Sequence, residues 1–270
     1  MRASEVLVDG LDHPEGVAWD PAAHVLWAGG QLYRVDVEKR TWELAARAPG
    51  FVLGLAVDGR GRLVVCCQGA GALCVLDDGA VQTLCNGLVF PNYPAFAPNG
   101  TLFFSDSGSW GSDDGRVYRL GVDGELEVLT DRLPHFPNGC AVTPDGRHLW
   151  LVESRVPTVN RIDLASGEVE EISRLDGTVP DGIAFAADGD AIVSCYRPDR
   201  IVRLRRDGST VVVAEDPQGT LVAAPTNVVF VGERRDRVVA ANLGRWHLTL
   251  LDIGVRGAPL HYPERWAADA

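Results

Sequence analysis

The chain has 270 residues, of which 46% are hydrophobic and 23% charged, and its formal net charge is −12. This is the composition of a soluble globular protein, and the acidic balance excludes the basic surface that nucleic-acid binders need. No segment approaches the roughly 20 consecutive apolar residues of a membrane span, and the N-terminal residues lack the apolar core of a signal peptide.

The six cysteines form neither a C-x-x-C pair nor a Cys/His spacing typical of zinc sites. Most of them stand in apolar, strand-like runs, so we expect buried, reduced thiols. Together with the N-terminal sequence, this predicts a cytoplasmic protein. The expected partner is a small-molecule substrate, with no nucleic acid and no membrane, and the expected assembly is a monomer or a weak homo-oligomer.

The first predicted strand covers residues 4–11, and it precedes a phrase of six residues that returns six times. The phrases are PEGVAW, VLGLAV, PNYPAF, PNGCAV, PDGIAF and PTNVVF, and they begin at Pro14, Val52, Pro91, Pro137, Pro180 and Pro225. Successive phrases therefore start 38 to 46 residues apart. A period near forty residues is typical of repeat architectures.

Each phrase is the first of four predicted strands in its repeat. Turn signals such as APNG and TPDG lead to second strands, at residues 62–67, 101–106, 147–152 and 190–195. Third strands follow at 115–120, 158–164 and 199–205, and fourth strands at 125–130, 168–173 and 209–214. No segment shows clear helical periodicity over 11 or more residues. The sequence predicts an all-β, six-bladed β-propeller with four-stranded blades, as a single domain spanning residues 1–270.

A closed ring needs a strand that joins its first and last repeats, because an open ring would expose sheet edges. Residues 4–11 belong to no repeat of their own, so we expect them to form the outer strand of the sixth blade. That blade continues through residues 238–243 and 247–253. The tail after about Pro263 consists mainly of polar or small residues, and we expect it to be disordered.

The second residue of each phrase is expected to face the central channel, because the inner strands share one alternation of side-chain directions. These residues are Glu15, Leu53, Asn92, Asn138, Asp181 and Thr226. Two carboxylates and two carboxamides in one ring provide oxygen ligands suited to a hard divalent cation. Glycine follows in PEG, PNG and PDG, where it lets neighbouring backbones approach closely near the axis.

Three motifs, PEGVAW, PNGCAVTPDG and PDGIAFAADGDAIVSCYRPDRIVRL, resemble the SMP-30/gluconolactonase/regucalcin family of six-bladed propellers. The resemblance implies a metal-dependent hydrolase that opens lactones with metal-activated water at the channel mouth. Its implied metal ligands are Glu15, Asn138 and Asp181, with Asn92 as a fourth ligand or a substrate contact. Asp181 is expected to act also as the general base.

The expected cofactor is one divalent cation, with Ca²⁺ first and Mg²⁺, Mn²⁺, Zn²⁺ or Fe²⁺ as alternatives. Aldonolactonases of the family often carry Arg two residues before the Asn that Asn92 matches, whereas this chain has Phe90. That difference argues against a sugar lactone. Loop 105–115 adds three candidate substrate contacts to Phe90 and Asn92, namely Asp106, Trp110 and Asp113. Leu53 is expected to be an apolar wall, and Thr226 a supporting hydroxyl or channel lining.

Three alternatives to a lactonase stay open. The Glu/Asn/Asn/Asp set also resembles that of calcium-dependent phosphotriesterase propellers, so another electrophile can be the substrate. A non-catalytic propeller that binds calcium or another ligand is a second alternative, since a fold does not determine a function. A strictosidine-synthase-like condensation is the third. The ring of acids and amides favours an enzyme, and the absence of G-x-S-x-G disfavours a serine hydrolase.

Overall fold

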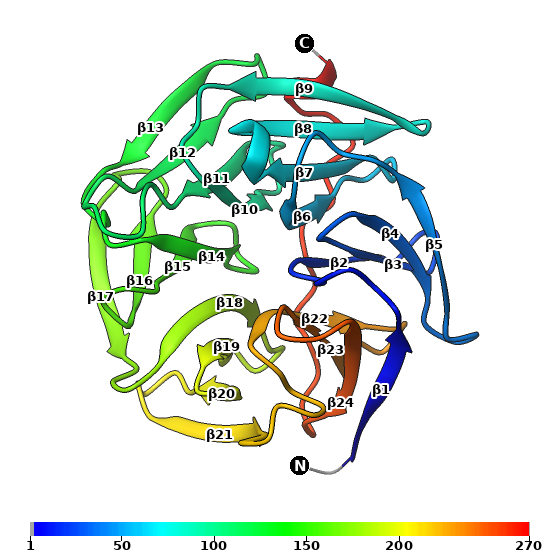
Figure 1. The fold of residues 1–270 in the computed structure, drawn as a ribbon. Coiled ribbons are helices and arrows are strands. Elements are labelled where there is room, and N and C mark those ends of the chain that lie inside the picture. The colour runs from blue at the N-terminus through cyan, green and yellow to red at the C-terminus, as the bar shows by residue number, and fades with distance from the viewer. Residues whose placement is uncertain (1–2, 270) are drawn as a thin grey trace.

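Each repeat folds into one antiparallel sheet of four strands, and six such sheets surround a central channel (Figure 1). The computed structural model describes residues 3–269 of the chain. Those residues form 24 strands and two short 3₁₀ helices, η1 (Gln68–Ala70) and η2 (Ala267–Asp269). The predicted all-β, six-bladed propeller is therefore confirmed. The proposed domain boundaries, residues 1 and 270, lie outside the described residues.

The four strands of each blade follow one another from the channel outward. Blade one contains β2 (Val17–Asp20), β3 (Val25–Ala28), β4 (Leu32–Asp36) and β5 (Thr41–Ala46). Blade two contains β6 (Val52–Val57), β7 (Leu63–Cys67), β8 (Ala72–Asp77) and β9 (Ala80–Asn86). Blade three contains β10 (Pro91–Phe96), β11 (Leu102–Asp106), β12 (Arg116–Leu120) and β13 (Leu126–Thr130). Blade four contains β14 (Pro137–Val142), β15 (His148–Glu153), β16 (Thr158–Asp163) and β17 (Val169–Arg174). Blade five contains β18 (Val179–Phe185), β19 (Ala191–Arg197), β20 (Arg200–Leu204) and β21 (Thr210–Glu215). Blade six contains β22 (Pro225–Val231), β23 (Arg237–Asn242), β24 (His247–Asp252) and β1 (Ala3–Asp9).

The N-terminal strand closes the ring. β1 pairs antiparallel with β24, from Ala3 opposite Asp252 to Asp9 opposite His247. It is the outermost strand of the sixth sheet, as the sequence predicted. This pairing places the N-terminal strand beside the last strand of the sixth repeat, so the ring is held shut by backbone hydrogen bonds.

The inner strands carry a local irregularity that sets the direction of their side chains. In blades two to five the register with the second strand shifts between the first and fourth residues of the phrase, for example between Pro91 and Pro94. Such a bulge lets two residues with an odd separation face the same side. The second and fifth residues of these phrases can therefore both face the channel.

Glycines at the third position of the phrase allow the blades to meet near the axis. A Cβ atom on Gly16 would lie 2.1 Å from the carbonyl oxygen of Leu53, and one on Gly139 would lie 2.3 Å from that of Asp181. No larger residue fits at such distances. The close approach of neighbouring backbones that the sequence predicted is thus present.

The prediction of a disordered tail is wrong. Residues 253–269, which we term the strap, cross the channel at the end opposite to the start of the inner strands (Figure 1). Trp266 is 1% exposed, and its Nε1 donates to Asp58 Oδ2 at 2.7 Å. Asp269 pairs with Arg62 at 2.8 Å. The polar composition of the tail does not reveal that it is ordered, because the order comes from one buried tryptophan and the ion pair of Asp269 with Arg62.

All six cysteines are unpaired, and all but the half-buried Cys85 are buried. This agrees with the expected reduced thiols. Within residues 3–269, no helix has the length and apolar character needed to cross a membrane.

Candidate metal centre

The four residues predicted to hold a cation share an unusual property. Each has a buried side-chain oxygen that accepts no hydrogen bond, namely Glu15 Oε2, Asn92 Oδ1, Asn138 Oδ1 and Asp181 Oδ1. No other buried side-chain oxygen within residues 3–269 lacks a partner. An unsatisfied buried acceptor costs about 1–3 kcal/mol, so native proteins rarely keep several together without a ligand. The four oxygens therefore fit a hard divalent cation.

The amide of Asn92 is oriented by a neighbouring serine. Asn92 Nδ2 donates to Ser107 Oγ at 2.9 Å, and Ser107 Oγ donates in turn to the carbonyl oxygen of Pro137 at 2.7 Å. Because the NH₂ group is engaged, the amide oxygen is the atom left without a partner. Ser107 thereby links the amide of blade three to the first inner-strand residue of blade four.

Blade four repeats this arrangement. Asn138 Nδ2 donates to Ser154 Oγ at 3.0 Å, and Ser154 Oγ donates to the carbonyl oxygen of Pro180 at 2.7 Å. Sequence reasoning missed both serines. The signal was present, because each serine follows an acid at the end of the second strand, in Asp106-Ser107 and Glu153-Ser154.

The two carboxylates come from blades that are not neighbours. Burial raises the pKa of Asp181 well above its usual value. Burial and the charge of Asp181 together raise the pKa of Glu15. Blade six separates these residues along the ring, so their interaction shows that both side chains reach toward the axis. A divalent cation would offset the two negative charges.

The remaining two positions of the ring do not offer ligands. Thr226 Oγ1 donates to the carbonyl oxygen of Glu15 at 2.6 Å, so its hydroxyl supports the backbone of a ligand residue. Leu53 is buried and apolar. Within residues 3–269, no group of three or more His, Cys, Asp or Glu side chains is placed to hold a metal ion. The candidate centre contains as many amides as acids, so a search for clusters of titratable side chains alone does not find it.

Among the predicted substrate contacts, Asp106 is buried in the protein. Its carboxylate accepts hydrogen bonds from the backbone nitrogens of Val89 at 2.9 Å and Phe90 at 2.6 Å. This places Asp106 as a support for the segment that carries Phe90. Its direct contact with a substrate stays a prediction.

The other predicted contacts lie around the channel mouth, the end where the inner strands begin. Trp110 is 56% exposed and packs its ring against Phe136, as Phe90 does. Asp113 is exposed and forms ion pairs with His135 at 3.0 Å and Arg155 at 2.8 Å. These pairs attach loop 105–115 to blade four. Contacts of Phe90, Trp110 and Asp113 with a substrate stay predictions.

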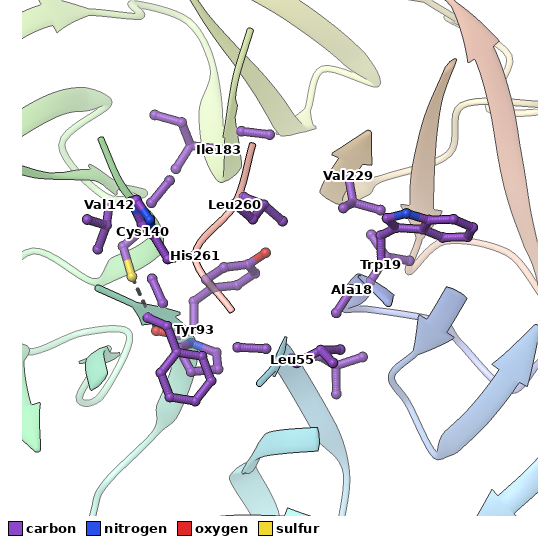
Figure 2. Close-up of a pocket in the computed structure, with 18 of the residues that line it drawn as sticks. Ala18, Trp19, Leu55, Tyr93, Cys140, Val142, Ile183, Val229, Leu260 and His261 are labelled. Carbon is purple, nitrogen blue, oxygen red and sulfur yellow. Dashed lines mark hydrogen bonds between the residues drawn. The ribbon is translucent and has the colours of Figure 1, made fainter. Parts of the chain in front are cut away.

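An apolar cavity of about 80 Å³ lies in the channel, lined by residues of the inner strands and of the strap (Figure 2). The fifth residues of the six phrases contribute to its lining, and they are Ala18, Ala56, Ala95, Ala141, Ala184 and Val229. Five of the six are alanines, which leave the axis open. Leu260, His261 and Tyr262 of the strap line its opposite end. None of the four oxygen-bearing residues lines this cavity, so the channel is polar at the mouth and apolar beyond it.

A comparison with known families decides the relationship. The model of the SMP-30/gluconolactonase/LRE-like region matches residues 13–241. The chain belongs to this family. The matched region contains all four oxygen-bearing residues.

The sequence identity to individual curated relatives is low. The chain is 27% identical over 206 residues to Protein STRICTOSIDINE SYNTHASE-LIKE 6 of Arabidopsis thaliana, and the match covers 66% of this chain and 55% of that protein. The chain thus spans about half the length of this relative. It is 22% identical over 256 residues to lactonase drp35 of Staphylococcus saprophyticus, covering 84% of this chain and 78% of that protein.

Solved structures agree on the fold. A gluconolactonase from Xanthomonas campestris superposes with a TM-score of 0.79 at 24% identity, covering 92% of this chain and 89% of that chain. Regucalcin from Agrobacterium tumefaciens, a calcium-binding protein, superposes with a TM-score of 0.80 at 18% identity, covering 97% and 96%. At these identities the likeness establishes the shared six-bladed architecture and leaves the substrate of this chain to be inferred.

Proposed function

We propose that this protein is a divalent-cation-dependent hydrolase that opens a lactone at the mouth of the channel. The observation that carries the proposal is the set of four buried oxygens without donors, on Glu15, Asn92, Asn138 and Asp181. Ca²⁺ is our first candidate because the donors are all oxygens, with Mg²⁺, Mn²⁺, Zn²⁺ and Fe²⁺ as alternatives. When bound, the cation would polarise the lactone carbonyl and lower the pKa of water.

Asp181 is the residue best placed to move a proton. Its carboxylate is buried, and burial raises its pKa, as it does that of Glu15, so either group is a stronger base than a solvated carboxylate. We assign Asp181 the proton of the attacking water. Glu15 has the same charge, and its backbone is fixed by Thr226. We therefore assign Glu15 to cation binding.

Asn92 and Asn138 cannot titrate, so their contribution is a fixed pair of amide oxygens. Ser107 and Ser154 hold both amides in place before any ligand arrives. Ligand oxygens that are already held in position reduce the reorganisation needed for cation binding and for the development of charge in the reaction.

The other features of the proposal concern the setting of the reaction. We propose a small-molecule substrate, no nucleic-acid or membrane partner, and a monomer or weak homo-oligomer. The net charge of −12 supports the exclusion of nucleic acid. Six unpaired cysteines support a reducing compartment such as the cytoplasm.

Elemental analysis of the purified protein and a lactone panel test the proposal. Hydrolysis should be followed with a pH indicator, before and after chelation, with spontaneous hydrolysis subtracted. We expect lactone opening that chelation abolishes and added Ca²⁺ restores. Full activity in metal-free protein would contradict the metal dependence. A phosphotriester belongs in the panel, and preference for it would favour the alternative hydrolase. Metal binding without any turnover would favour a non-catalytic propeller.

A further inference from the structure

Three aromatic rings form a continuous wall at the mouth of blades three and four, which we term the aromatic wall. Phe136 lies at its centre, with ring centroids 5.4 Å from Phe90 and 4.8 Å from Trp110. Phe90 and Phe136 occupy the same position in their repeats, two residues before Asn92 and Asn138 respectively. Phe90 and Phe136 therefore directly precede the two inner strands, β10 and β14, that carry the amides.

Phe136 is held in an unfavourable backbone conformation. Its φ is 65°, in the left-handed region that bulky residues rarely adopt, and Pro137 follows it. Two hydrogen bonds hold this segment: Ser154 N donates to Phe136 O at 3.0 Å, and His135 N donates to Glu153 Oε1 at 2.8 Å. His13 and Ala224, which directly precede the first proline of their own phrases, also have positive φ, at 46° and 48°, so this conformation recurs at the mouth of three blades.

Trp110 is fixed to the wall although it is largely exposed. The ion pairs of Asp113 with His135 and Arg155 attach its loop to blade four. Its ring meets that of Phe136 edge to face, at an interplanar angle of 72°. More than half of Trp110 remains open to solvent, and this exposed aromatic surface is available to a ligand.

We infer that the aromatic wall binds an apolar alkyl or aryl substituent of the substrate, beside the amide oxygens. This inference rests on the proposed function, since it assumes that the ester group of a lactone lies at the four oxygens. Burial of apolar surface against the rings favours such substituents. Sugar hydroxyls packed there would lose their hydrogen bonds to water. The substrate class is therefore a lactone with an apolar side chain.

Binding of lactams tests the wall without turnover, because a lactam keeps the ring carbonyl but resists hydrolysis. Calorimetric titration of the Ca²⁺-supplied protein should use δ-valerolactam without a side chain and with butyl and hexyl chains. We expect the affinity to rise roughly two- to fourfold for each methylene that contacts the wall. Equal affinity for all three lactams would overturn the inference.

Three variants localise the effect. Phe136→Gly removes the buried ring, 8% exposed, against which Phe90 and Trp110 pack, at a position where glycine is unstrained, and Trp110→Ala removes an exposed ring. Both should flatten the dependence of affinity on chain length. Trp246→Ala is the matched control, because Trp246 is 57% exposed, lies in the equivalent turn of blade six and contacts His13. An unchanged dependence in the first two variants, or an equal loss in the control, would overturn the assignment.

Hydrolysis separates this inference from the proposed function. The ratio of kcat/KM for hexyl-substituted to unsubstituted δ-valerolactone should fall at least severalfold in Phe136→Gly. Lactam affinity that depends on chain length and on Phe136, without any lactone being opened, would contradict the proposed function but support binding of an apolar substituent at the aromatic wall. Lactone opening with a kcat/KM that does not depend on chain length would support the proposed function but contradict the assignment of the aromatic wall.

Discussion

Asn138 and Ser154 are joined by a hydrogen bond of 3.0 Å from the amide nitrogen to the serine oxygen. The same serine hydroxyl donates to the carbonyl oxygen of Pro180, which directly precedes Asp181 in the chain. One hydroxyl thus fixes the direction of an amide in blade four and the start of the inner strand in blade five. Two oxygens of the proposed cation site are positioned through a single side chain.

Ser154→Ala and Ser107→Ala should each lower cation affinity roughly 10- to 100-fold, as loss of a ligand's supporting hydrogen bond usually does. The cause is the freed amide, which can turn its nitrogen toward the ring. Calorimetric titration of chelated protein with Ca²⁺ measures this. Ser194→Ala is the control, because Ser194 is buried and bonds only backbone groups, of Gly182 and Thr226. A comparable loss in the control would point to general destabilisation.

Asp181→Asn keeps an oxygen in the ring but removes the proposed base and one negative charge. Turnover should fall roughly 10²- to 10⁴-fold, the range typical of lost general base catalysis. Glu15→Gln removes the same charge without removing the base, so its turnover at saturating cation should fall less. Rates of lactone opening at a series of Ca²⁺ concentrations distinguish the two. Equal losses at saturation would place the proton transfer on another group.

The metal-free protein should lose stability as the pH rises. Burial raises the pKa of Asp181, and burial with the charge of Asp181 raises the pKa of Glu15. Such groups bind protons more tightly in the folded state than in the unfolded state. Stability is therefore lost as the pH rises from the unfolded carboxyl pKa of about 4 through the raised pKa values of the folded state. The Tm of chelated protein should therefore fall as the pH is raised above about 4.

Two comparisons check this pH dependence. Added Ca²⁺ should remove the fall, since a cation that binds only the folded state stabilises the ionised pair. Asp181→Asn should reduce the fall in chelated protein, because it removes one of the two titrating groups. A chelated wild type that is equally stable at both ends of the pH range would show that the two carboxylates do not titrate as the geometry indicates.

Much of this molecule was predictable because it is repetitive. The six phrases indicated the number of blades, and the equivalence of Glu15, Asn138 and Asp181 brought distant residues to one ring. Ser107 and Ser154 were not found, although they occupy equivalent positions after an acid, because the repeat does not show that each serine orients the amide of its own blade and bonds the inner strand of the next. The position of Phe136 beside Trp110 depends on ion pairs of loop 105–115, which no periodicity encodes. Such contacts follow from the three-dimensional structure alone.

The strap gives a final test, at the end of the channel opposite the proposed centre. Trp266 is 1% exposed, packs against Phe96 with ring centroids 5.1 Å apart, and donates to Asp58. Trp266→Ala should lower the free energy of unfolding by about 3–5 kcal/mol, the usual cost of removing a buried aromatic ring. Denaturant titration measures this, and Trp246→Ala should cost less because Trp246 is exposed.

Cation affinity should change little in Trp266→Ala, because the strap contacts the ends of the inner strands and the four oxygens lie at their beginnings. A stability loss without a loss of affinity would show that the strap stabilises the propeller independently of the proposed centre. If Trp266→Ala were no more costly than Trp246→Ala, the tail would be dispensable, as its composition first indicated. A joint loss of stability and affinity would instead mean that the strap supports the inner strands along their whole length.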